Sequence, residues 1–135
     1  MILDSNIIIY AAKPENDFLR QFIVAQTPSV SAASYVEVLG FHKLTAGEKA
    51  YFEQFFATAP FLMITRAILD RAVALRQTRK MSLGDSLIAG TALSHDRTLV
   101  TRNTKDFDWI VGLNLLDPFE ALNKGDDAQE GVEKS

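Results

Sequence analysis

Short apolar runs rich in β-branched residues alternate with longer helical stretches along most of this chain of 135 residues. The short runs, which we expect to be strands, are residues 2–3, 28–31, 61–64, 98–101 and 114–116. The stretches between them carry apolar side chains at helical spacing, as Phe52, Phe55 and Phe56 do. Such alternation implies right-handed crossovers and a parallel sheet that helices cover on both faces. The sequence therefore predicts a three-layer α/β/α fold with a central parallel sheet of four to five strands.

The length of the chain predicts one domain, and 47% of its residues are hydrophobic, enough for a sizeable core. We assign residues 1–122 to this domain. Residues 123–135 are polar and acidic, which predicts a disordered tail. The chain has no cysteine, no apolar run near the ~18 residues of a membrane span, and no basic segment typical of a secretory signal. We therefore expect a cytoplasmic protein without disulfides, thiolate metal sites or membrane contact.

Four acidic residues stand where such a fold would gather side chains from distant segments. They follow strands or open helices, and they are Asp4, Glu37, Asp85 and Asp106. In a parallel sheet, ligands bind beyond the carboxyl ends of the strands. Carboxylates collected there repel one another unless a cation joins them, and hard Mg²⁺ or Mn²⁺ prefers carboxylate oxygen. The pattern predicts a carboxylate metal site, which suits chemistry on phosphate.

Two of these acids have an alternative role as helix caps. Ser34 and Glu37 match a capping box, and Ser82 and Asp85 form a similar pair. Acids in the first turn of a helix also complement the helix dipole. Under this interpretation Glu37 and Asp85 stabilise helices and hold no metal.

The placement of the acids favours a shared site. Asp85 lies on the apolar face of its helix, and Asp4 ends a buried strand, so both need a partner. Of Asp106 and Asp108, Asp106 lies nearer the preceding strand and is the preferred fourth acid, with Asp108 as the alternative.

Four motifs in order carry a resemblance to a known family. They are LDSNI at 3–7, Glu37, LGDSLIA at 83–89 and VTRNTKDF at 100–107, and LDPF at 116–119 closes the series. This arrangement resembles the PIN-domain nucleases, above all the small VapC-type toxins of toxin–antitoxin pairs. The resemblance covers residues 1–119.

The resemblance implies roles for individual residues. The acids that bind Mg²⁺ (or Mn²⁺) and carry catalysis correspond to Asp4, Glu37, Asp85 and Asp106. The supporting polar positions correspond to Ser5, Asn6, Thr101 and Asn103. Some family members carry Asp where this chain has Asn103, which leaves open whether one or two metal ions are held.

The resemblance also implies a function. The chain would be a metal-dependent endoribonuclease that hydrolyses RNA by in-line attack of metal-activated water, leaving 5′-phosphate and 3′-hydroxyl ends. Its expected partners are RNA, a cognate antitoxin laid across the acidic site, and a second copy in a homodimer. The aromatic stretch at 51–56 and the helix around 35–41 are the candidate contact surfaces.

Basic and aromatic residues bear on the expected RNA partner. The net charge of −3 argues against nucleic acid, but bases gather late in the chain at Arg66, Arg71, Arg76, Arg79, Lys80, Arg97, Arg102 and Lys105. They form either an RNA-binding face or a solvated helix surface. Trp109 with Phe107 is a candidate for base stacking, against a core role that is commoner. His42 and His95 are candidate zinc ligands, against an exposed or capping role that we favour.

Other functions remain as alternatives. A receiver-type phospho-acceptor domain also uses strand-end acids, but it needs two adjacent acids where Asp4 stands alone. It also needs a late lysine beside the site, for which Lys105 is a candidate in the wrong local context. A catalytically silent PIN-like binding module is a second alternative, although all four acids are present. A nuclease directed at DNA is a third, because a fold does not dictate its substrate.

Overall fold

Five short strands form one parallel sheet in the computed structural model, which describes residues 1–120. The strands are β1 (Ile2–Leu3), β2 (Ser29–Ser31), β3 (Phe61–Leu62), β4 (Leu99–Val100) and β5 (Leu115–Leu116). Every adjacent pair runs parallel, with Ile2 paired to both Ser29 and Leu99. The predicted parallel sheet is confirmed. The predicted acidic tail at 123–135 lies outside the described residues.

The order of the strands creates a switch point beside the central strand. The order across the sheet is β3-β2-β1-β4-β5, so the chain first builds outward from β1 on one side and then on the other. The crossovers on the two sides leave a crevice at the carboxyl ends of β1 and β4, where ligands of open α/β sheets bind. Asp4 follows β1 and Thr101 follows β4. The fold therefore brings these two residues to the crevice.

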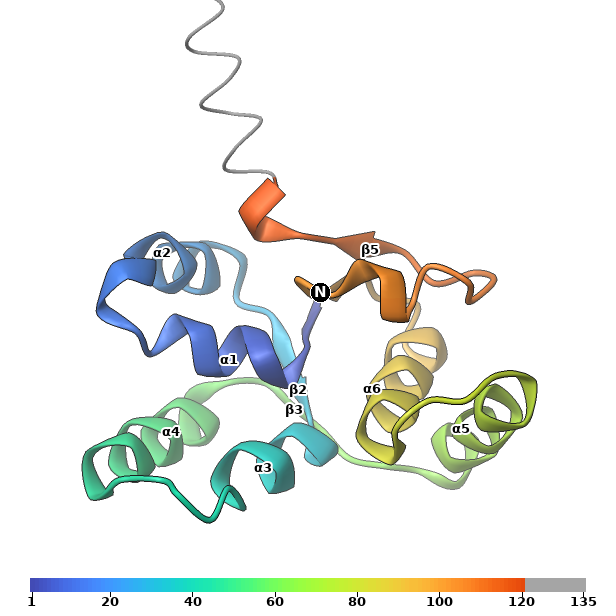
Figure 1. Cartoon of the computed structure of the whole chain (residues 1–135), viewed down its shortest axis with the longest axis horizontal. Helices are drawn as coiled ribbons and strands as arrows, with labels where there is room; N and C mark the ends of the chain where they lie inside the picture. Colours follow the sequence, from blue (N-terminus) through green and yellow to red (C-terminus); the bar gives the residue numbers. More distant parts are fainter. Residues whose placement is uncertain (121–135) are drawn as a thin grey trace, which may run out of the picture.

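Helices cover both faces of the sheet. They are α1 (Ser5–Ala11), α2 (Asp17–Gln26), α3 (Ala32–Leu39), α4 (Ala46–Thr58), α5 (Arg66–Thr78) and α6 (Leu83–Ser94), with 3₁₀ turns η1 (Pro14–Asn16) and η2 (Thr104–Asp106). Figure 1 shows α1 to α4 on one side of the sheet and α5 and α6 on the other.

Successive residues of a strand pack into two separate hydrophobic cores, because their side chains point to opposite faces of the sheet. Ile2 packs into the cluster with α6, whereas Leu3 packs into the cluster with α1 and α4. The predicted three layers are confirmed.

Helix starts agree with the sequence where a Ser or Thr caps, with two exceptions. Thr45, Thr65 and Ser82 each accept a hydrogen bond from the first turn of their helix. Ser5, a residue type that favours the N-cap position, is instead the first residue of α1, after the N-cap residue Asp4.

The predicted capping box of Ser34 and Glu37 is also wrong. The helix α3 begins earlier, because the Ser31 hydroxyl accepts a hydrogen bond of 3.0 Å from the Ala33 amide. Ser34 is therefore buried inside the helix, and Glu37 stands a full turn beyond the residues that could reach the cap. Its carboxylate is free for another role.

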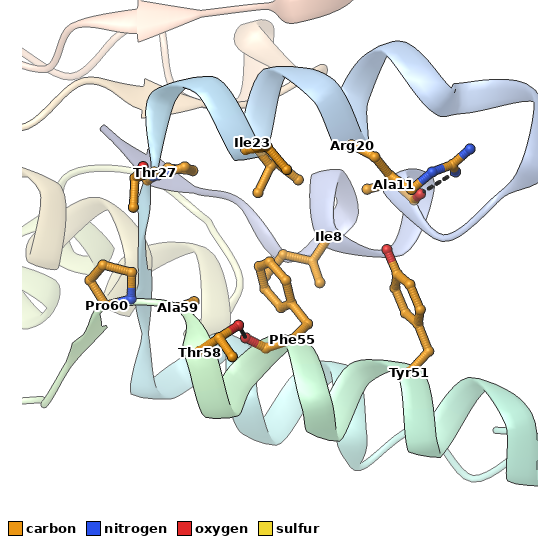
Figure 2. A pocket seen from close by; sticks show the side chains of 12 residues that line it. Ile8, Ala11, Arg20, Ile23, Thr27, Tyr51, Phe55, Thr58, Ala59 and Pro60 are labelled. Carbon is orange, nitrogen blue, oxygen red and sulfur yellow. Dashed lines mark hydrogen bonds between the residues drawn. The ribbon is translucent and has the colours of Figure 1, made fainter.

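An apolar groove lies open on the surface of the described chain. Figure 2 shows a groove between α2 and α4, with Ile8 of α1 at its floor. Its volume is about 370 Å³, and we call it the apolar groove; it is lined by Ile8, Ala11, Arg20, Ile23, Val24, Thr27, Pro28, Tyr51, Phe55, Thr58, Ala59 and Pro60. The Arg20 guanidinium already has hydrogen-bond partners within the chain, because it donates to the carbonyls of Ala11 and Lys13 at 2.8 and 2.7 Å.

In residues 1–120 no helix is both long and apolar enough to cross a membrane.

Candidate active site

The carboxylate of Asp4 is the most buried acid of the predicted site, with 4% of the residue exposed. The residue occupies the N-cap position of α1, yet its side chain makes no capping hydrogen bond. Instead Oδ2 accepts a hydrogen bond of 2.8 Å from the Thr101 hydroxyl, across the crevice between β1 and β4. The expectation that Asp4 requires a partner is thus met by Thr101, which is fully buried.

Burial and neighbouring charges make the Asp4 carboxylate costly to ionise. The pKa of Asp4 is raised from 3.8 to about 6; burial is the largest cause, and the hydrogen bond from Thr101 opposes the shift. The negative charges of Asp85 and Glu37 also contribute to raising this pKa. Three of the four predicted acids are therefore close enough to repel one another, a repulsion that a bound cation would relieve.

A pair of serines holds the Glu37 carboxylate. Glu37 Oε1 lies 2.8 Å from the Ser5 hydroxyl, which also lies 2.9 Å from the hydroxyl of Ser34. A hydroxyl has one proton to donate, so Ser34 donates to Ser5 when Ser5 donates to Glu37. The chain of three residues joins α1 to α3 and directs an otherwise exposed carboxylate toward the crevice. Ser34, which the sequence placed in a cap, belongs to the surroundings of the site.

The opposite side of Glu37 contacts Gly84 in the first turn of α6. A methyl group on Gly84 would lie 2.6 Å from Cδ of Glu37 and 2.8 Å from its Oε1, which is closer than such atoms approach. The absence of a side chain therefore lets the carboxylate approach the amino end of a helix, where the dipole favours negative charge. In the sequence, the signal for this role is the glycine of the LGDSLIA motif, for which no role was predicted.

Asp85 lies beside Gly84 and is partly buried. The Ser82 hydroxyl accepts a hydrogen bond of 3.1 Å from the Asp85 amide, so the predicted cap is confirmed. Burial raises the pKa of the Asp85 carboxyl, a hydrogen bond with Ser82 opposes the shift, and the charges of Glu37 and Asp106 raise it further. Capping and membership of the acidic group therefore coexist in this residue.

The two candidates for the fourth acid separate in space. Asp106 ends η2 and lines a cavity of about 520 Å³ together with Asp85, whereas Asp108 is not among the residues of that cavity. Of these two residues, Asp106 alone contributes a charge that raises the pKa of Asp85. The geometry thus brings Asp106, rather than Asp108, into the acidic group.

Asn103 and Asn6 complete the predicted polar set, and both are exposed. The Asn103 backbone amide donates to the Thr101 hydroxyl at 3.1 Å, which orients that hydroxyl toward Asp4. No hydrogen bond involves the side chains of Asn6 and Asn103 within residues 1–120, so both are open to a ligand.

The acids surround the crevice without converging on one point. Among residues 1–120, no three His, Cys, Asp or Glu side chains lie close enough together to hold one ion as they stand. The donor set nevertheless fits a hard divalent cation, because it consists of carboxylates whose charges repel one another around the buried Asp4. Asp106 is exposed, and its carboxylate makes no hydrogen bond or ion pair within residues 1–120, so it has the most freedom to move toward a shared ion.

The predicted zinc alternative gains no support from the two histidines. His42 is exposed and stacks against Phe41, with ring centroids 5.3 Å apart, and His95 is the C-cap residue of α6. The favoured exposed and capping roles match these positions.

The eight predicted bases do not form a single face. Arg66 pairs with Asp70, Arg97 donates to Ser29, and Arg102 stacks on Phe119. Only Arg79, Lys80 and Lys105 line the cavity that contains Asp85 and Asp106.

The aromatic pair near this cavity also divides. Phe107 is buried in the core and cannot stack a base, whereas Trp109 is partly exposed and lines the cavity.

Comparison with known proteins identifies the family. The sequence profile described as PIN domain matches residues 1–111. The chain belongs to the PIN-domain family. A toxin–antitoxin complex from Klebsiella pneumoniae contains a chain that is 31% identical, with a TM-score of 0.69; the match covers 87% of this chain and 96% of that one. The family predicted from the four motifs is therefore confirmed. No curated protein matches the sequence significantly.

More distant solved structures share the fold of this PIN domain. VapBC-1 from nontypeable Haemophilus influenzae is 25% identical with a TM-score of 0.72, and the match covers 87% of this chain and 97% of that one. DNA-bound VapBC from Salmonella typhimurium is 21% identical with a TM-score of 0.77, and covers 87% and 96% of the two chains. These likenesses show that the fold of this chain is shared with chains of solved VapBC structures.

Proposed function

We propose that this PIN domain is a metal-dependent endoribonuclease and the toxin of a toxin–antitoxin pair. The observation that carries the proposal is the buried Asp4 carboxylate at the switch point, surrounded by other acids that raise its pKa. Membership of the PIN family supports hydrolytic nuclease chemistry. The toxin–antitoxin complex from Klebsiella pneumoniae supports the toxin role.

The metal would be Mg²⁺ or Mn²⁺, held by Asp4, Asp85 and Asp106, with Glu37 as a direct or water-mediated ligand. A divalent cation in such a site supplies Lewis-acid chemistry, since it lowers the pKa of coordinated water and offsets negative charge on a phosphoryl group. The set of donors includes no histidine or cysteine, which favours a hard cation over zinc. Asn103 carries no charge, so the residues leave open whether a second ion is held.

The remaining residues have positioning roles in this proposal. Thr101 holds the Asp4 carboxylate, and the Asn103 amide holds Thr101. Ser5 fixes the Glu37 carboxylate, which Gly84 allows close to the start of α6. Asn6 and the Asn103 side chain, both exposed, would reach a phosphate of the RNA. In this way the chain fixes its acids before the substrate arrives.

An antitoxin is the proposed protein partner, and the apolar groove between α2 and α4 is a surface that fits it. The groove presents Val24, which is 80% exposed, and Tyr51, which is 40% exposed, beside Phe55. An apolar helix laid between α2 and α4 would bury these side chains. Hydrogen exchange of the α4 amides, measured with and without a candidate antitoxin, tests this contact; unchanged exchange would place the antitoxin elsewhere.

Self-association remains part of the proposal, and so does a cytoplasmic location. A second apolar hollow adjoins Glu37 and is lined by Val36 and Leu83, which are 68% and 59% exposed. A second copy that covered this hollow would also shield the acidic site from one side. Light scattering at micromolar concentration distinguishes dimer from monomer, and Val36→Asp should shift a dimer toward monomer.

The test of the nuclease incubates purified, antitoxin-free protein with total RNA in Mg²⁺, Mn²⁺ or EDTA. Asp4→Asn and Asp85→Asn should abolish cleavage. Asp96→Asn is the matched control, because Asp96 lies past the far end of α6 with φ 51°, a conformation that Asn tolerates. The proposal would be supported by cleavage that needs metal and leaves 5′-phosphate ends. This cleavage should occur in the wild type and in Asp96→Asn but not in Asp4→Asn or Asp85→Asn.

Other outcomes would contradict it in distinct ways. Products with 2′,3′-cyclic phosphate would mean attack by the RNA hydroxyl rather than by water. If the RNA stays intact while Mn²⁺ raises the melting temperature of the wild-type protein but not of Asp4→Asn, the metal site would be supported and RNA would be rejected as the substrate. Cleavage of DNA at an equal rate would favour a broader nuclease. Folded protein that binds no metal would favour the silent module. The receiver alternative loses ground, because the chain belongs to the PIN family and Asp4 is the single acid after β1.

A further inference from the structure

A cavity of about 520 Å³ opens beside the acidic site and differs from it in charge. Asp85 and Asp106 form part of its lining, together with three cations, Arg79, Lys80 and Lys105. The cations come from two segments that are distant in sequence, the α5–α6 connection and η2. We call it the Lys80–Lys105 cavity. In this cavity, Asp85 and Asp106 of the acidic site lie together with three basic side chains.

The three cations are free to receive an anion. Within residues 1–120, none of them has a carboxylate oxygen within 4.0 Å, although two carboxylates line the same cavity. All three are exposed, so their charges cost little to maintain in solvent. On a chain of net charge −3, they form a local excess of positive charge next to acids that would otherwise repel a polyanion.

Trp109 adds a flat apolar surface at the same cavity. Its indole Nε1 donates a hydrogen bond of 2.9 Å to the Asp106 carbonyl, which fixes the ring relative to that acid. The Arg79 guanidinium lies 5.0 Å from the centre of the ring and stacks over it. An aromatic ring flanked by cations is the combination that binds a single-stranded nucleic acid, through base stacking and phosphate contacts.

We propose that the Lys80–Lys105 cavity binds the RNA strand next to the bond that is cleaved, and so sets how RNA approaches the acids. Lys80 and Lys105 contact backbone phosphates, and Trp109 with Arg79 stacks against an adjacent base. This inference rests on the proposed nuclease function and adds the substrate-binding residues to it. An acidic peptide would satisfy the lysines but leave the indole without a stacking partner, which is why RNA is favoured.

The first experiment compares two double variants of equal charge loss. Lys80→Gln/Lys105→Gln removes the cavity lysines. Lys43→Gln/Lys49→Gln removes two exposed lysines, one in the turn before α4 and one within α4, a helix that lies far from α6 in Figure 1. Steady-state cleavage of a short single-stranded RNA is measured at several KCl concentrations. The cavity variant should raise KM about tenfold with kcat changed less than about threefold, whereas the control should leave both unchanged.

The second measurement separates binding from chemistry. RNA affinity is measured by fluorescence anisotropy with Mg²⁺ in an Asp4→Asn background, which is expected not to cleave. Removing both cavity lysines should make the plot of log Kd against log salt shallower by about 1.4, because each lysine releases its share of counterions. Trp109→Leu should weaken binding about tenfold, and Trp109→Phe, which keeps a ring, less than about threefold.

Each result bears on one of the two ideas. RNA cleavage with an unchanged KM in the cavity variant would overturn the inference and leave the nuclease intact. Lysine-dependent RNA binding by a wild type that never cleaves would support the cavity and reject the nuclease. Binding of an oligoglutamate peptide that depends on Lys80 and Lys105, with RNA affinity unchanged in their absence, would assign the cavity to an acidic protein segment and overturn the inference.

Discussion

The Thr101 hydroxyl donates a hydrogen bond of 2.8 Å to Oδ2 of Asp4, joining residues that are 97 positions apart. The bond joins the ends of β1 and β4, the two neighbouring strands between which the order of strand addition reverses. It is the single side-chain bond that opposes the rise in the Asp4 pKa, whose main cause is burial. The geometry of the most buried acid therefore depends on one hydroxyl from the other half of the sheet.

Replacement of this hydroxyl should destabilise the fold in a pH-dependent way. Thr101→Val keeps the shape of the side chain but removes the one side-chain donor to the buried carboxylate, which should cost about 1–3 kcal/mol of unfolding free energy. The loss should be largest at pH 8, where Asp4 is ionised, and smaller at pH 5. Thr101→Ser should retain most of the stability. Urea denaturation in EDTA measures both; an equal loss at the two pH values would assign the effect to packing.

The ionisation of Asp4 should itself reduce stability at neutral pH in the absence of metal. Its pKa is about 6 in the folded chain and 3.8 as the reference value, so the folded state binds the proton more tightly. Stability is therefore greatest at low pH and is lost as the pH rises between these two values, by up to about 3 kcal/mol. Above pH 6, Asp4→Asn should be more stable than the wild type in EDTA, and this difference should shrink toward pH 4.

Metal should reverse the order of the two proteins in that comparison. Mn²⁺ should raise the melting temperature of the wild type, because a bound cation offsets the repulsion among the acids. It should leave Asp4→Asn almost unchanged. If Asp4→Asn proves less stable than the wild type in EDTA at pH 8, the buried carboxylate is not the unfavourable charge that its pKa indicates.

Gly84→Ala should impair activity while it preserves the fold. A methyl group at this position meets the Glu37 carboxylate, which must then move away from the start of α6. Displacement of a group at the reacting centre by about 1 Å can lower the rate about 100-fold. Gly47→Ala in α4 is the matched control, since a methyl group there meets no atom within 4 Å. Cleavage assays on both variants measure the activity, and thermal unfolding measures the stability of the fold. Full activity in Gly84→Ala would show that Glu37 has no role in the mechanism.

The sequence predicted the fold well because hydrophobic periodicity is local. The predicted parallel sheet and the predicted cap at Ser82 both agree with the structure, which has five strands. The N-cap of α3 was predicted wrongly because Ser31 and Ser34 are both suitable capping residues. Ser31 lies at the end of β2, where the chain turns, and it is the residue that caps the helix. Ser34 was assigned to a cap for the same reason, although burial sends its hydroxyl to Ser5.

The site was less accessible to prediction, because its details depend on tertiary contacts. The four acids were found because their positions at strand ends and helix starts can be inferred from the sequence. The bond between Thr101 and Asp4 depends on the register of β1 against β4. The approach of Glu37 to Gly84 depends on how α3 lies against α6. Distances of this kind arise between elements, and no local pattern encodes them.

The choice between Asp106 and Asp108 gives the sharpest test of the fourth acid. The two residues are both exposed, so replacement by Asn should leave the fold intact in either case. Asp106 shares a cavity with Asp85 and raises its pKa, whereas Asp108 does neither. Asp106→Asn should therefore abolish metal-dependent cleavage and lower the Asp85 pKa toward its ordinary value. Asp108→Asn should cleave at the rate of the wild type.

Two measurements on this pair keep catalysis and metal binding apart. Cleavage rates report the chemistry. Isothermal titration calorimetry with Mn²⁺ reports the affinity of the site for the metal. Asp106→Asn should weaken Mn²⁺ binding, since a carboxylate oxygen is replaced by a neutral amide. If Asp108→Asn is the inactive variant instead, the loop after η2 must rearrange when the ion binds. Equal activity in both variants would leave Asp4, Glu37 and Asp85 as the complete acidic set.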